Sequence, residues 1–70
     1  MTSYDFENLE LKYWDYIRFI NEKGEGLMGN FEDEYENSKG TFKFSNHSSG
    51  RSEVIHLSNI QQWLEPEIKL

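Results

Sequence analysis

Apolar and polar residues alternate in five short stretches of this chain. The pattern is clearest in residues 16–20 (YIRFI) and 41–45 (TFKFS), where apolar side chains recur at every second position. A period of two is typical of a strand with one face in a core and the other in solvent. Residues 27–31, 52–57 and 60–64 follow related patterns, so the sequence predicts five strands.

The segments between these stretches are rich in turn residues. Residues 21–26 contain two glycines, residues 46–51 combine Asn, Ser and Gly, and residues 58–60 leave room for a single tight turn. Gly29, between two large apolar residues, indicates a bend or a close approach of another backbone segment. We therefore expect a mainly β fold, a small five-stranded barrel of residues 14–65. The side chains expected to fill it are Ile17, Phe19, Leu27, Phe31, Phe42, Phe44, Ile55, Leu57, Ile60 and one of Trp63 or Leu64.

The N-terminal segment, residues 1–13, fits two structures. Thr2 precedes Asp5 by three positions, as in a capping box, and Phe6 and Leu9 recur at helical spacing. The end of the segment alternates as a strand would. Acidic side chains near its start favour the dipole of a helix, so we expect a short N-terminal helix or arm. Residues 66–70 are expected to form a C-terminal tail.

Charge and cysteine usage narrow the function classes. Thirteen acidic against seven basic residues give a net charge of −6, which repels phosphate backbones and disfavours nucleic acid as a partner. The chain has no cysteine, which suits a cytoplasmic protein without disulfides. It also lacks any apolar run near the roughly 18 residues of a membrane span. We expect no membrane contact.

Groupings typical of catalysis are missing from the sequence. His47 and His56 have no cysteine or histidine partner at metal-ligand spacing. Ser48 and Ser49 are not preceded by the strand-to-helix elbow that presents a nucleophile. The sequence therefore predicts a protein that is not an enzyme and has neither a metal nor a cofactor.

An acidic segment supplies the first candidate site. Its residues are Glu32, Asp33, Glu34, Tyr35 and Glu36. Three interpretations fit: a solvated loop, a divalent-cation site, or a recognition segment whose carboxylates replace phosphates in the basic groove of a partner around Tyr35. The spacing lacks the calcium-loop pattern, which leaves a solvated loop or partner recognition as the stronger interpretations.

Outward apolar residues supply the second candidate site. If Ile17 and Phe19 point into the core, Tyr16 and Ile20 point out of it. Further residues expected on this outer surface are Trp14, Met28, Val54 and Trp63. Such a patch exceeds what a soluble monomer usually exposes. The N-terminal arm could cover it with Phe6 and Leu9, a protein partner could bind it, or the chain could self-associate.

The order of these segments resembles the Sm-like branch of the small SH3-like barrels. The matching text is Tyr16–Asn21, then Leu27–Phe31 with its central glycine, then Ile55–Ile60 with its one-turn reversal, about half of the chain. The resemblance implies an oligomeric RNA-binding protein in which Asp33 and Asn37 read bases.

The leading hypothesis is a non-enzymatic, acidic, cytoplasmic protein-interaction module. A phage or mobile element could encode such a chain as an inhibitor of a nucleic-acid-binding host protein. The alternatives are the Sm-like oligomeric RNA-binding protein and a structural subunit of a larger assembly. RNA binding ranks below protein binding because of the net charge of −6.

Overall fold

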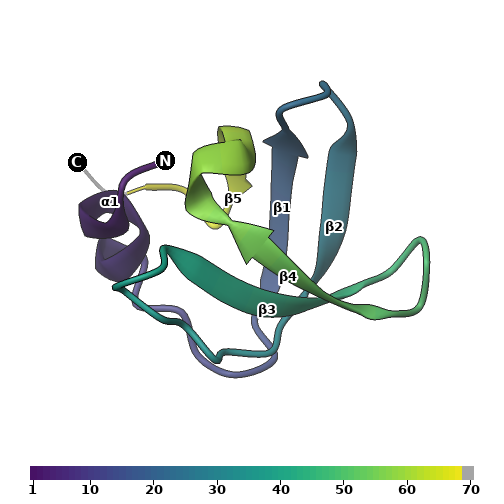
Figure 1. Ribbon diagram of the computed structural model, residues 1–70. Coiled ribbons are helices and arrows are strands. Elements are labelled where there is room, and N and C mark those ends of the chain that lie inside the picture. Colours follow the sequence, from purple (N-terminus) through teal and green to yellow (C-terminus); the bar gives the residue numbers. More distant parts are fainter. Residues whose placement is uncertain (69–70) are drawn as a thin grey trace.

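The computed structural model of the chain describes residues 1–68 (Figure 1). Its elements are α1 (Ser3–Asn8), β1 (Tyr16–Asn21), β2 (Gly26–Phe31), β3 (Thr41–Asn46), β4 (Ser52–His56), a 3₁₀ turn (Leu57–Asn59) and β5 (Ile60–Glu65). The five strands and the short N-terminal helix predicted from the sequence are confirmed. Of the expected tail, residues 69 and 70 lie outside the described part.

The five strands form one antiparallel sheet in the order β4-β3-β2-β1-β5. On β1, Phe19 faces Leu27 of β2 on one side and Trp63 of β5 on the other. β4 and β5 are the two edges and do not pair with each other in the part of the chain described. The mainly β fold is thus confirmed, whereas closure into a barrel is not.

The core lies on the inner face of the bent sheet. Its buried side chains are Phe6, Ile17, Phe19, Phe31, Phe42, Phe44, Leu57 and Ile60. Leu27 and Ile55, also predicted to point inward, are half-buried and pack against this group. Trp63 rather than Leu64 completes it, because the Trp63 ring stacks on Phe19 with centroids 5.7 Å apart.

Gly29 of β2 lies in close contact with β3. A Cβ atom at this position would clash with the Ser45 carbonyl oxygen and come within 2.9 Å of the Phe44 ring. No side chain can be accommodated there without moving the backbone of β3. Of the two features that the sequence indicated at Gly29, the close backbone approach is confirmed.

Helix α1 contributes its one buried residue, Phe6, to the core. The Thr2 side chain caps the helix by accepting a hydrogen bond from the Asp5 backbone N–H at 3.1 Å, as the sequence predicted. Phe6 stacks on Phe42 with centroids 4.8 Å apart and meets Phe31 edge-on. Figure 1 shows α1 beside the start of β3.

This placement excludes one interpretation of the N-terminal arm. Because Phe6 packs on the inner face of the sheet, it does not cover the outward aromatic residues, and the hypothesis that it does is wrong. In residues 1–68, the structure has no helix with the length and apolar character needed to cross a bilayer.

Candidate functional site

A group of large side chains is exposed where the chain enters β1. Tyr13, Trp14, Tyr16 and Met28 are 67%, 52%, 41% and 42% exposed. The Tyr13 and Trp14 rings lie 5.7 Å apart, and the Tyr16 ring lies 6.0 Å from that of His47. Tyr16 and Met28 point outward from the neighbouring strands β1 and β2. We call the following five residues the aromatic patch: Tyr13, Trp14, Tyr16, Met28 and His47.

The backbone that presents Trp14 is strained and firmly held. A tight turn precedes the strand, with the Lys12 N–H bound to the Asp15 carboxylate at 2.8 Å. Trp14 has φ of 74°, a left-handed conformation that costs a bulky residue on the order of 1–3 kcal/mol. Its N–H donates to Phe31 O at 2.6 Å, and its carbonyl accepts from Asn30 Nδ2 at 3.0 Å. These bonds hold the backbone of Trp14 in the conformation that leaves its indole half-exposed.

Asn30 joins the two loops that carry the patch. Its Nδ2 donates to the Trp14 carbonyl, and its Oδ1 lies 2.6 Å from His47 Nε2. The His47 backbone N–H in turn donates to Met28 O at 3.0 Å. One amide side chain therefore holds the loop before β1 against the turn after β3, and the patch is preorganised.

The acidic segment, residues 32–36, does not form one charged surface. Three of its four carboxylates have their own partners. These are Ser52 Oγ for Glu32 (2.6 Å), Lys43 Nζ for Glu34 (3.3 Å) and Lys39 Nζ for Glu36 (3.3 Å). Two of the partners are basic, so part of the segment's charge is compensated on the surface.

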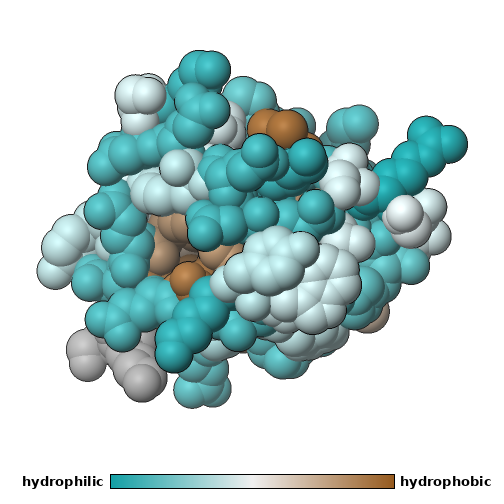
Figure 2. Space-filling view, turned by 90° about the horizontal axis from the view of Figure 1, so that it is seen from below, coloured by the Kyte–Doolittle hydropathy of each residue, from teal (hydrophilic) through white to brown (hydrophobic). Residues whose placement is uncertain are grey.

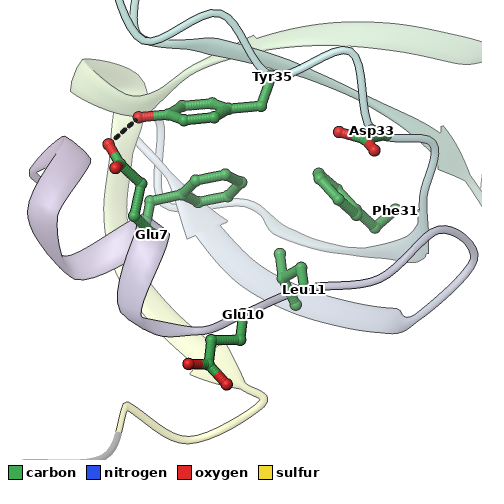
Figure 3. Close-up of a pocket in the computed structure, with 7 residues that line it drawn as sticks. Glu7, Glu10, Leu11, Phe31, Asp33 and Tyr35 are labelled. Carbon is green, nitrogen blue, oxygen red and sulfur yellow. Dashed lines mark hydrogen bonds between the residues drawn. The ribbon is translucent and has the colours of Figure 1, made fainter.

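The remaining residues of that segment help to form a pocket. Its volume is about 180 Å³ and its lining residues are Phe6, Glu7, Glu10, Leu11, Phe31, Asp33 and Tyr35. We call it the acidic pocket. Apolar surface is visible in a hollow surrounded by hydrophilic side chains in Figure 2, and the lining residues are drawn in Figure 3. Residues from α1, from the arm after it and from the loop after β2 thus meet in one cavity.

One wall of the pocket is formed by Tyr35 and Glu7, which are hydrogen-bonded to each other. Tyr35 packs against Phe6, with centroids 4.9 Å apart, and its O–H donates to Glu7 Oε2 at 2.8 Å. Asn37 Nδ2 donates to the same oxygen at 3.0 Å. Burial, with a smaller contribution from the Glu7 carboxylate, raises the pKa of Tyr35 above its usual value. Tyr35 therefore stays a neutral donor.

The three carboxylates of the pocket differ in direction. In Figure 3 the Asp33 carboxylate faces the space between the Tyr35 and Phe31 rings, whereas that of Glu10 points away from the other two. Both Asp33 and Glu10 have positive φ, 65° and 51°. Glu7 lies at the mouth, bound to Tyr35.

The structure brings together only some of the residues predicted for the outward patch. Trp14, Tyr16 and Met28 share the aromatic patch. Val54 is 62% exposed but lies on β4, opposite Lys43 of β3. Ile20 is half-buried near the far end of β1, and Trp63 packs on the core with its Nε1 donating to Pro66 O at 2.7 Å.

Asp33 and Asn37, which the Sm-like resemblance implied for RNA binding, have different surroundings in the structure. Asp33 lines the acidic pocket, while the Asn37 amide is bound to Glu7. Sequence reasoning missed Glu7, Glu10 and Leu11 as site residues. Glu7 has no local signal, because its partner Tyr35 lies 28 positions away.

Metal chemistry has no support in the part of the chain described, where no group of three or more His, Asp or Glu side chains is placed to hold an ion. Comparisons with protein-family models, with curated proteins and with solved structures give no match to this chain. The fold and surfaces define a small, mainly β protein with an exposed aromatic patch beside an acid-lined pocket.

Proposed function

We propose that this chain is a non-enzymatic protein-interaction module that binds a protein partner through the aromatic patch. The observation that carries the proposal is the exposure of four large side chains at the entry to β1 and on the paired strand β2, namely Tyr13, Trp14, Tyr16 and Met28. Tyr, Trp and Met are enriched in protein interfaces, where their apolar bodies are buried and their polar atoms find partners.

The conformation of Trp14 also supports this proposal. A strained φ persists only where surrounding contacts enforce it, and such strain concentrates at functional positions. Here the hydrogen bonds to Phe31 and Asn30 enforce it, and the result is a half-exposed indole. A rigid aromatic side chain loses little entropy on binding, which favours affinity.

The scaffold that we propose is a small SH3-like barrel. The strand order β4-β3-β2-β1-β5, the close approach of Gly29 to β3 and the 3₁₀ turn before β5 support it. Of the Sm-like residues expected to read RNA, Asn37 is already bound to Glu7. Together with the net charge of −6, this favours a protein partner over RNA.

Selection from a displayed library of random peptides tests the proposal. We expect wild-type protein to enrich peptides that the double variant Trp14→Ser, Tyr16→Ser binds at least about 30-fold more weakly. Loss of a single buried aromatic anchor, on the order of 2 kcal/mol, already corresponds to this factor. Val54→Ser, which removes an equally exposed apolar side chain outside the patch, is the matched control and should bind as wild type does. Recovery of no patch-dependent peptide would contradict the proposal.

A further inference from the structure

The acidic pocket combines an apolar wall with carboxylates, and none of the residues 1–68 that line it is basic. We propose that it binds a basic side chain, arginine or lysine, of a partner protein. This inference rests on the proposed function only in taking the partner to be a protein. It concerns a different set of side chains from the aromatic patch.

The size of the pocket favours a single side chain. Its volume of about 180 Å³ is below the roughly 300–1,000 Å³ that is typical of sites for small-molecule ligands and cofactors. A linear side chain that enters from a partner surface needs less space, because its backbone stays outside. The pocket is therefore a subsite of an interface.

The walls suit the methylene groups of such a side chain. Phe6, Phe31 and Tyr35 line the pocket with aromatic rings. In Figure 3 Leu11 lies on the side of the pocket opposite Tyr35. Arginine and lysine bury their aliphatic stems against apolar surface while the charged end seeks polar partners. A cation over an aromatic face is attracted further by the negative face of the ring.

The charges select a cation. The Asp33 carboxylate faces the cavity and has neither a hydrogen-bond donor nor an ion-pair partner within residues 1–68. Glu7 accepts hydrogen bonds from Tyr35 and Asn37, both of them neutral. Neither carboxylate is neutralised by a base in that part of the chain. An incoming guanidinium or ammonium group would supply the missing charge.

The pocket adjoins the aromatic patch. The backbone of Phe31, which lines the pocket, accepts the hydrogen bond from the Trp14 N–H at 2.6 Å. Leu11 and Tyr13 are likewise two residues apart in one short loop. One partner can therefore bury apolar side chains on the patch and place a basic side chain in the pocket.

The test is an NMR titration of the whole chain with N-acetylarginine methylamide and N-acetyl-lysine methylamide. The citrulline analogue, which has the shape of arginine without its charge, is the control ligand. We expect saturable amide shifts in residues 6–11 and 31–35 with at least one of the two cations, at concentrations on the order of 10 mM, and none with citrulline.

Two variants with the same change of charge sharpen the test. Asp33→Asn keeps a residue that tolerates the positive φ, so the fold should persist. We expect it to weaken binding about tenfold, or about 1.4 kcal/mol. Glu36→Gln removes an acid that pairs with Lys39 outside the pocket and should leave the affinity unchanged.

Several outcomes would overturn the inference. These are equal binding of citrulline, no saturable shift with either cation, shifts confined to other residues, or an unchanged affinity of Asp33→Asn. None of them affects the peptide test of the aromatic patch, which uses Trp14 and Tyr16. Conversely, cation binding in the pocket without any patch-dependent peptide would support this subsite and contradict the proposed function.

Discussion

The aromatic residues of this chain divide between two regions with different chemistry. All five phenylalanines are buried on the inner face of the sheet. Three of the four tyrosines are exposed, as is Trp14. Phenylalanine has no polar atom to satisfy and packs where water is excluded, whereas the hydroxyl and indole N–H groups can remain hydrated at a surface.

The two regions also differ in how the backbone holds the rings. Phe42 and Phe44 lie in β3, which pairs with β4 in continuous register, so ordinary strand geometry orients them. Trp14 lies outside a strand at positive φ and depends on particular hydrogen bonds. The inner region is thus stabilised by packing itself, and the outer region is maintained at a cost in backbone strain. This difference predicts that the two regions respond in opposite ways to mutation.

The largest effect is expected in the inner region. Phe42 is 1% exposed and contacts the rings of Phe6, Phe19 and Phe31. Phe42→Ala should lower the free energy of unfolding by about 3–5 kcal/mol, much of the roughly 4–10 kcal/mol expected for so short a chain. Urea unfolding followed by circular dichroism measures it. The control Tyr4→Ala, at a 77% exposed position, should change the free energy of unfolding by under about 0.5 kcal/mol. Equal losses of stability in Phe42→Ala and Tyr4→Ala would contradict the difference between the two regions.

An intermediate effect is expected at Tyr35, which is half-buried against the inner region and directs its hydroxyl to Glu7. Tyr35→Phe keeps the ring contact with Phe6 and removes the hydrogen bond to Glu7. We expect a loss of about 1 kcal/mol at neutral pH. The same urea unfolding experiment measures it, and a variant as stable as wild type would show that this bond does not hold the loop to α1.

The stability difference between these two proteins should also depend on pH. Because burial raises the pKa of Tyr35 in the folded protein above 10.0, the native state binds this proton more tightly than the unfolded state. Its contribution is fully present below pH 10 and is lost as the pH rises through the folded pKa. Wild type should therefore lose more stability than Tyr35→Phe above pH 10. An equal loss of stability in wild type and Tyr35→Phe above pH 10 would contradict the raised pKa of Tyr35.

The smallest change in stability, with the opposite sign, is expected in the outer region. Trp14→Gly relieves the strain at φ 74° and should raise the free energy of unfolding by about 0.5–1 kcal/mol. Thermal unfolding measures the change, and patch-selected peptides should no longer bind. A variant that is both less stable and still able to bind peptides would show that the indole is a structural residue.

Much of the fold could be predicted because local patterns determine it. Strict alternation in residues 16–20 and 41–45 identified two strands and their inward residues, and Thr2 identified the start of α1. Whether β4 and β5 pair depends on the summed bend of all five strands, which no local pattern encodes. The placement of Phe6 on the inner face likewise depends on space left by residues distant in sequence.

The site could be predicted only in part for the same reason. Period-two alternation placed Tyr16 and Met28 on the outer surface, and the acid-rich text drew attention to Asp33 and Tyr35. The contacts that organise both sites join distant residues, such as Asn30 with His47 and Tyr35 with Glu7. The sequence allowed Trp63 either in the core or on the outer surface, and its stacking on Phe19 places it against the core.

The unlike surroundings of the two tryptophans provide separate optical signals. Trp63 is stacked on Phe19 with its Nε1 hydrogen-bonded, so its fluorescence should report loss of the native core. Trp14 is half in water, and its emission should move to shorter wavelength when a ligand covers it. With Trp63 replaced by Phe, the remaining indole becomes a label-free reporter of occupancy, readable in the same cuvette as an unfolding titration.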